Sequence, residues 1–319
     1  MWFIEKLGIK IMLSRRNIRI KVMQLLYAAG KDAQLNIGDL SRRYQSYGVK
    51  SLELYLFCLQ QLVEVAQYSV KDEATRKAKL RPTEEDKRFT PRLFNNDLVQ
   101  SLVKSETYQK LIKKHLISAR IEEDNTRFLY LEFSKTDVYK QFLLDEQAPV
   151  LPVLLELFRT MYKSEDFNEV LEDHYPSWID DESLIVGAIK KTLKGLPEHR
   201  DLLTEYGEED KETLQFGDQL LMQTYKKDGL LLEDIKPMLQ NWDSERVASI
   251  DMILLKMATC ELTAFPTIPT KVTINEYVDV SKDYSTDKSK DFVNGILDRL
   301  MKKLGEEGRI VKEGRGLVD

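Results

Sequence analysis

The sequence predicts an all-α fold, and three observations support that prediction. Hydrophobic residues make up 42% of the 319-residue chain and charged residues 32%, which is typical of a globular protein rich in helix. Apolar residues recur with a helical period in most segments, and few stretches alternate with the period of two that marks a strand. The main alternating stretch is residues 126–133, TRFLYLEF, and a single strand cannot make a sheet. The length corresponds to about two domains.

The first expected helix covers residues 14–30, SRRNIRIKVMQLLYAAG, whose apolar residues share one face. Ser14 suits the N-cap, because its hydroxyl can accept a hydrogen bond from a backbone N–H, and Gly30 suits the C-terminal stop. The expected linkers, residues 80–92 and 196–210, combine proline, glycine and mixed charge. The other helices expected before residue 241 cover residues 37–46, 51–79, 94–118, 135–145, 151–163, 166–173, 181–194, 211–226 and 231–240.

The clearest pattern lies in residues 241–304, where helices are expected at 243–263, 272–284 and 287–304. A corner with two prolines, TAFPTIPTK, separates the first two. The last helix has a regular apolar face but carries Asn294 and Gly295 in its middle. Glycine there costs about 1 kcal/mol relative to alanine, and asparagine prefers caps and turns. The pair therefore needs a structural or functional reason.

Several classes of function receive no support from the sequence. No stretch approaches 18 consecutive apolar residues and no signal peptide precedes the first helix, so we expect a cytoplasmic protein without a membrane partner. The motifs GxxxxGK[ST], GxGxxG and HExxH are missing and the three histidines are far apart, so we expect no catalytic site, no metal and no cofactor. Cys58 and Cys260 lie in apolar runs and are expected to be buried thiols.

A local basic segment contrasts with the overall net charge of −5. From Lys6 to Lys31 the chain has seven basic residues and no acidic one. Arg15, Arg16 and Arg19 stand at the start of the first helix, where the helix dipole favours anions. Contact with RNA or DNA phosphates would offset that penalty. The alternative is an ordinary solvated helix face.

The C-terminal pattern resembles a known family. From Trp242 to Leu300 the chain contains W-x-x-E-R, D, L-x-x-x-A-x-x-E-L, I-P-x-K-V-x-I-N-E and F-V-N-G-I-L-D-R-L in that order. This combination resembles the transcription antitermination factors of the NusB family. The segment RRNIRIKVMQLLY, residues 15–27, is similar to the family's N-terminal arginine helix, and residues 211–240 look like the helix pair before the block.

The resemblance implies two small helical bundles packed together. Residues 75–205 have no counterpart in small NusB proteins and are expected to be a helical insertion, which either enlarges the scaffold or adds a binding surface. The implied organisation is an N-terminal extension (1–13), NusB-like N-terminal helices (14–74), the insertion (75–205), a NusB-like C-terminal bundle (206–304) and a flexible tail (305–319).

The implied function is binding rather than a reaction. NusB proteins pair with the ribosomal protein NusE and bind single-stranded boxA-type RNA, which helps the RNA polymerase antitermination complex to transcribe ribosomal RNA operons. Two alternatives remain open. NusB-like domains also assist RNA binding beside ribosomal RNA methyltransferases, although residues 31–210 lack the alternating strands and glycine-rich loop of such an enzyme. The net charge of −5 also suits a helical interaction scaffold without RNA binding.

The resemblance also assigns roles to single residues. Phe292 matches an aromatic that borders the family's RNA site, and Lys288 and Lys290 beside it can meet phosphates while bases stack on the ring. A well-known relative carries an acid at the position of Lys288. Together with Arg15, Arg16 and Arg19, these residues form the expected RNA site.

Four further residues receive non-RNA roles. Asp251 matches an acidic residue that faces NusE, whereas Glu261 falls on the buried stripe of the same helix and is expected to be internal. Asn294 and Gly295 are expected to be structural, with Gly295 permitting a neighbouring helix to cross closely and Asn294 hydrogen-bonded inside the crossing.

Overall fold

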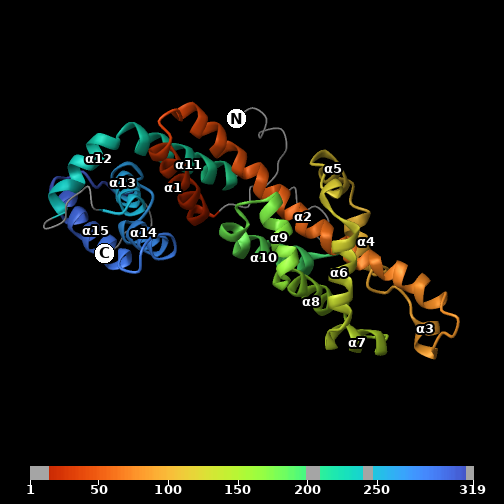
Figure 1. Ribbon diagram of the computed structural model, residues 1–319. Helices are drawn as coiled ribbons and strands as arrows, with labels where there is room; N and C mark the ends of the chain where they lie inside the picture. Colours follow the sequence, from red (N-terminus) through yellow and green to blue (C-terminus); the bar gives the residue numbers. More distant parts are fainter. Residues whose placement is uncertain (1–13, 199–208, 240–246, 314–319) are drawn as a thin grey trace. The chain divides into compact units, whose positions relative to one another are not determined.

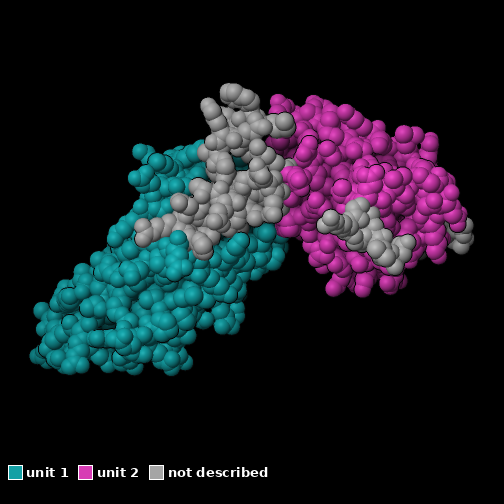
Figure 2. Space-filling view, turned by 180° about the vertical axis from the view of Figure 1, so that it is seen from behind, with its two compact units in different colours: residues 1–12, 48–210 teal, residues 13–47, 211–319 magenta. Residues whose placement is uncertain are grey.

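The computed structural model describes residues 14–198, 209–239 and 247–313, and these residues form α-helices, two short 3₁₀-helices and connecting loops (Figure 1). The all-α prediction is confirmed. The chain divides into two compact units, coloured separately in Figure 2. Of the described chain, unit 1 contains residues 48–198 and 209–210, and unit 2 contains residues 14–47 and the residues from 211 onward.

A single helix, α2 (Ile37–Lys77), belongs to both units and is 41 residues long. The sequence predicted two helices here, with a break near Gly48. Glycine in a helix interior costs about 1 kcal/mol, but burial of Tyr44 before it and Leu52 after it outweighs that cost. Residues 52–66 of α2 then supply a large share of the buried core of unit 1.

The rest of unit 1 is a series of shorter helices around this part of α2. In chain order they are α3 (Glu84–Arg88), α4 (Asp97–Val103), α5 (Glu106–Lys114), the 3₁₀-helix η1 (Ser118–Arg120), α6 (Glu123–Ser134), α7 (Asp137–Leu144), α8 (Val150–Lys163), α9 (Glu165–His174) and α10 (Trp178–Gly195). The expected single helix at 94–118 is instead α4 and α5, because Ser105 caps a new helix by accepting a hydrogen bond from the Tyr108 backbone.

The one candidate strand, residues 126–133, is helical and forms most of α6. Its buried residues are Thr126, Leu129, Tyr130 and Phe133, whose spacing is that of a helix face. The apparent alternation arose because Phe128 and Leu131, which are apolar, lie exposed on the other face. The alternating pattern therefore does not mark a strand here, which agrees with the all-α prediction.

Unit 2 combines α1 (Arg15–Lys31) and the start of α2 with the C-terminal helices. These are α11 (Glu209–Lys226), α12 (Asp228–Ile235), the 3₁₀-helix η2 (Lys236–Met238), α13 (Ser249–Ala264), α14 (Thr270–Tyr284) and α15 (Ser289–Glu306). Ser14 caps α1 as predicted, because its side chain accepts a hydrogen bond from the Asn17 N–H at 3.1 Å. Residues 240–246, where the expected helix 243–263 begins, lie outside the described residues, as do residues 1–13 and 199–208.

The close helix crossing in unit 2 is at Gly217 of α11, not at Gly295. A Cβ atom on Gly217 would overlap Ile18 and would lie 2.6 Å from Cζ of Tyr44, whose hydroxyl donates to the Leu214 carbonyl at 3.0 Å. No atom lies within 4 Å of a Cβ placed on Gly295, and the neighbouring Asn294 is exposed. The predicted structural role of Asn294 and Gly295 in a close crossing is therefore wrong, because this face of α15 is open.

The described part of the expected flexible tail is held in place. Arg309 donates two hydrogen bonds to the Asp234 carboxylate at 2.7 and 2.6 Å. Lys312 Nζ donates to the carbonyl oxygens of Phe265 at 3.0 Å and Glu261 at 3.3 Å, and so caps the C-terminal end of α13. Residues 305–313 thus contradict the prediction, while residues 314–319 lie outside the described chain.

Candidate RNA interface and partner groove

Arg19, one of the three arginines predicted to contact RNA, is buried in the core of unit 2. Its side chain is only 2% exposed and donates to both oxygens of Glu261, at 2.9 and 2.7 Å. Glu261 also accepts hydrogen bonds from Thr273 and Tyr277, each at 2.9 Å. Burial alone would lower the pKa of Arg19, but its bonds to Glu261 keep that pKa above the usual value, so the group stays charged. The RNA role predicted for Arg19 is wrong, and the internal role predicted for Glu261 is confirmed.

Arg15 and Arg16 remain on the surface at the start of α1. Arg16 is 45% exposed, and its guanidinium donates to Glu276 at 3.2 Å and to Asp279 at 2.5 Å, both on α14. The hydrogen bond to Glu276 is the main reason why the pKa of Arg16 is raised above its usual value. Arg15 is exposed, with its guanidinium 5.7 Å from the centre of the Phe216 ring. Two of the three predicted arginines are therefore accessible.

A shallow pocket of about 440 Å³ lies between α14 and the start of α15. Asp279, which holds Arg16, and Lys290 both line this pocket, so α1 and α15 contribute cations to neighbouring positions on one surface. Asn275 and Asn294 also line the pocket, together with Val278 and Asp291. The exposed Asn294 thus belongs to the candidate RNA surface rather than to a buried crossing.

Lys288 and Phe292 complete the predicted set at the start of α15. Lys288 is the N-cap residue and is exposed, as is Lys290. Phe292 is half-buried, so part of its ring is accessible. Asp291 follows Lys290 directly in the sequence, whereas Asp279 on α14 is brought beside Lys290 only by the fold.

Asp251 does not face a partner protein, contrary to the expectation from the resemblance. It lies in the first turn of α13, is 4% exposed, and accepts a hydrogen bond from Ser289 Oγ at 2.7 Å. As a charged residue, Asp251 would ordinarily lie on the solvent side of its helix. The start of α15 covers that side, so a polar side chain is buried there.

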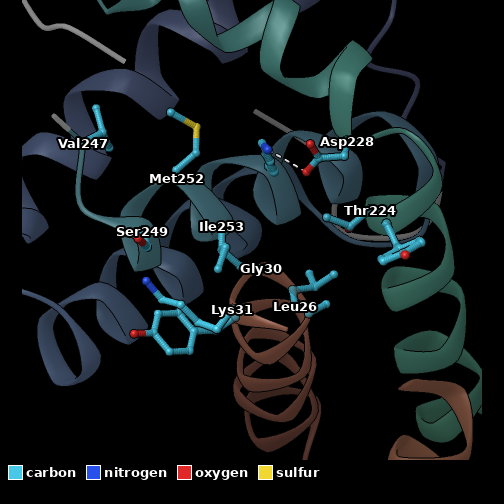
Figure 3. Close-up of a pocket in the computed structure, with 13 residues that line it drawn as sticks. Leu26, Gly30, Lys31, Thr224, Asp228, Val247, Ser249, Met252 and Ile253 are labelled. Carbon is cyan, nitrogen blue, oxygen red and sulfur yellow. Dashed lines mark hydrogen bonds and ion pairs between the residues drawn. The ribbon is translucent and has the colours of Figure 1, made fainter. Parts of the chain in front are cut away.

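A groove of about 660 Å³ opens on another face of α13 (Figure 3). Met252 and Ile253 of α13 and Leu26 of α1 provide apolar surface, and the aromatic rings of Tyr27 and Tyr225 are more than one-third exposed. The remaining lining residues are Ala29, Gly30, Lys31, Thr224, Asp228, Val247, Ser249 and Lys256, with an ion pair of 2.6 Å between Lys256 and Asp228. This groove was not predicted from the sequence, because its walls come from three stretches that lie far apart along the chain, residues 26–31, 224–228 and 247–256.

The described residues contain no group of three or more potential metal ligands. Cys58 and Cys260 are buried free thiols, as predicted, and burial raises the pKa of Cys260 to about 11. Among the same residues, no helix is long and apolar enough to cross a bilayer. Unit 2 presents a mixed-charge surface beside Lys290 and an apolar groove beside α13, and both suit the binding of a macromolecule.

Comparison with known proteins agrees with these features. The family model described as the NusB family matches residues 184–302. The transcription antitermination protein NusB of Salinibacter ruber is 40% identical over 111 residues, which cover 35% of this chain and 69% of that protein. NusB of Chloroherpeton thalassium is 47% identical over 79 residues (25% of this chain, 37% of the relative), and NusB of Natranaerobius thermophilus is 33% identical over 107 residues (33% and 77%).

No solved structure matches the chain significantly. The family match begins at residue 184, so the arginine helix and most of unit 1 lie outside it. The match does include α13, α14 and α15, which carry the pocket beside Lys290 and one wall of the groove. Because the chain is 40% and 33% identical to two of these relatives and covers 69% and 77% of their lengths, it belongs to the NusB family.

Proposed function

We propose that this protein is an RNA-binding transcription antitermination factor that acts by binding and not by catalysis. Its RNA site would comprise Arg15 and Arg16 of α1 and Lys288, Lys290 and Phe292 of α15. The observation that supports this best is the position of Asp279, which holds Arg16 and also lines the pocket beside Lys290. Cations from two distant segments therefore border one surface.

Single-stranded RNA of the boxA type suits this surface. The lysines and arginines can meet phosphates, while the accessible part of Phe292 can stack on a base. The ion pairs of Arg16 are partly solvated, and such pairs contribute about 0–1 kcal/mol, so an RNA phosphate can replace a carboxylate without a large penalty.

The test is RNA affinity measured at several salt concentrations. Each single-strand phosphate contact adds about 0.7 to the slope of log K against log salt, so Arg15→Ala with Arg16→Ala should flatten the slope by about 1.4. The matched control is Arg42→Ala with Arg43→Ala, which removes two exposed arginines of α2 in the same unit. Equal slopes for both double variants would contradict the proposed site. Arg19 is left unchanged because it holds the core.

We further propose that the groove beside α13 binds the NusE-type partner and so links the protein to the RNA polymerase antitermination complex. Exposed tyrosines around apolar side chains are typical of the central residues of protein interfaces. Met252→Asp should then abolish partner binding in calorimetry while RNA affinity measured alone stays unchanged. Retained partner binding would place the interface elsewhere.

A scaffold without RNA binding is the second candidate. The feature that favours it is the number of carboxylates at the site, because Glu276, Asp279 and Asp291 lie among the basic residues. An absence of RNA binding at low salt, together with normal binding of the NusE-type partner, would support this alternative. Unit 1 does not support the methyltransferase alternative. Its described residues form helices and loops, without the strands that such a domain needs.

A further inference from the structure

The first turn of α15 alternates exposed and buried residues. Ser289 is only 1% exposed, whereas Lys288 and Lys290 on either side of it are exposed. Successive residues of a helix point about 100° apart, so the buried position of Ser289 fixes the directions of both lysines. Whatever holds Ser289 in the core therefore controls how the two cations are presented.

A cluster of hydroxyl groups holds Ser289. Its Oγ accepts a hydrogen bond from the Thr286 N–H at 3.2 Å and lies 2.8 Å from Thr286 Oγ1 and 2.9 Å from Ser285 Oγ. The same Oγ donates to Asp251 Oδ2 at 2.7 Å. A hydroxyl has one proton. When Ser289 donates this proton to Asp251, its oxygen can accept hydrogen bonds from the 285–286 turn. Asp251 therefore decides which hydroxyls of the cluster donate and which accept.

Asp251 itself is an unusual choice for a buried position. Its Oδ1 is buried and has no hydrogen-bond partner among the described residues. An unsatisfied buried polar atom is costly. The cost is offset because Asp251 is in the first turn of α13 and its partner Ser289 is the first residue of α15, and helix N-termini stabilise a carboxylate. Lys288, the N-cap of α15, provides no side-chain cap of its own.

We propose that Asp251 is a positioning residue for RNA binding, which acts through Ser289 to hold the 285–290 turn so that Lys288 and Lys290, on either side of Ser289, are both presented to RNA phosphates. This inference rests on the RNA site proposed above. Asp251 does not touch RNA, because α15 covers it. On α13 it lies on the side away from Met252 and Ile253, which line the partner groove.

The test is a double-variant cycle in RNA binding. Losing two phosphate contacts lowers the salt slope by about 1.4, which corresponds to about 25-fold weaker binding at 0.1 M salt. Lys288→Ala with Lys290→Ala should show that loss, and Asp251→Ala should weaken binding about tenfold with a flatter slope. When Asp251→Ala is added to the variant that already lacks both lysines, it should weaken RNA binding little further. A general structural defect would instead add its full effect there and would also weaken binding at the groove.

Three further variants make the result decisive. Asp251→Asn keeps an acceptor for Ser289 and should retain RNA affinity within about twofold, since a carbonyl oxygen also accepts a hydroxyl proton. Ser289→Ala removes the donor without changing charge and should reproduce Asp251→Ala even if that variant folds poorly. Asp287→Ala removes an exposed acid from the same turn and should not weaken binding.

The two proposals fail in different ways. Wild-type affinity after loss of both lysines would overturn the RNA site, and this inference with it. A second outcome would overturn only the positioning role. In it, Lys288→Ala with Lys290→Ala clearly weakens RNA binding, but Asp251→Ala and Ser289→Ala both keep wild-type affinity and salt slope. Additive effects in the cycle would also overturn that role.

Discussion

Two glycines of unit 2 have opposite surroundings and should respond oppositely to the same change. Gly217→Ala introduces a methyl group that overlaps Ile18 and Tyr44, and overpacking of this kind typically costs about 1–3 kcal/mol. Gly295→Ala introduces a methyl group into open space on a helix, where alanine is favoured by about 0.5–1 kcal/mol. Urea denaturation followed by circular dichroism should show a lower midpoint for the first variant and a higher one for the second. A lower midpoint for Gly295→Ala would show that α15 is crossed closely after all.

Leu116 in unit 1 is a residue with stored backbone strain. Its φ of 51° is in the left-handed region, and its side chain is 67% exposed, so little burial offsets the strain. It ends α5 at the position where helices usually carry glycine, with its own N–H bonded to Lys113 O and the Ile117 N–H bonded to Ile112 O. Leu116→Gly should therefore stabilise the protein by about 1 kcal/mol. Leu116→Ala is the control, since alanine keeps the strain, and equal stability of the two variants would contradict this account.

At the scale of elements, the segment after α15 acts as a clamp on α12 and α13. Arg309 pairs with Asp234 of α12, and half-buried Lys312 caps the carbonyl end of α13. Ending the chain after Glu307 should lower stability by about 1–2 kcal/mol, because the ion pairs of Arg309 with Asp234 and Glu307 and the cap from Lys312 are lost. Ending it after Glu313 should leave the melting temperature unchanged. Identical melting curves for the two truncations would mean that this segment contributes nothing.

The helix α2 shows how an element can belong to two cores. Its first part packs in unit 2, where Tyr44 bonds to Leu214 and Ser41 Oγ donates to Asp218 at 3.2 Å. Its later part supplies buried residues between Leu52 and Ala66 to the core of unit 1. The helix therefore cannot be assigned whole to one domain, as the expected boundary at residues 74 and 75 would require.

At the scale of the whole molecule, we propose that unit 1 is an inserted scaffold that RNA binding does not need. Residues 14–47 joined to residues 211–313 by a short Gly/Ser linker should fold and keep RNA affinity, since the proposed RNA residues lie in unit 2. A short linker is enough because the hydrogen bond between Tyr44 and Leu214 brings the two ends near each other.

A second deletion tests whether the inserted part begins at residue 48, as the units indicate, or at residue 75, as the sequence predicted. Removing only residues 75–205 would uncover apolar residues of α2 such as Leu59 and Leu62, so this variant should aggregate in sedimentation experiments. If the 14–47/211–313 protein folds by circular dichroism but does not bind RNA, unit 1 contributes to the site and the scaffold role is wrong.

The sequence by itself determined what depends on neighbours within a few residues. Helical periodicity predicted the all-α fold, Ser14 marked the start of α1, and the block from Trp242 to Leu300 identified the family. Each of these signals is local, because helix hydrogen bonds and caps join residues three or four apart. Two exposed cations of the proposed RNA site were also named from short stretches of sequence, Arg16 from the basic segment and Lys290 from the family motif.

The tertiary structure alone decided which polar residues are buried and which helices touch. Arg19 was predicted to face RNA, but Glu261, 242 residues away, holds it in the core. Asp251 and Gly217 likewise take their roles from Ser289 and Tyr44, which belong to other helices. Burial of a charge is stable only when a partner meets it, and the partner's position depends on how the whole chain packs. The position of a partner 242 residues away cannot be read from local sequence, so only the fold could separate the buried arginine from its two exposed neighbours.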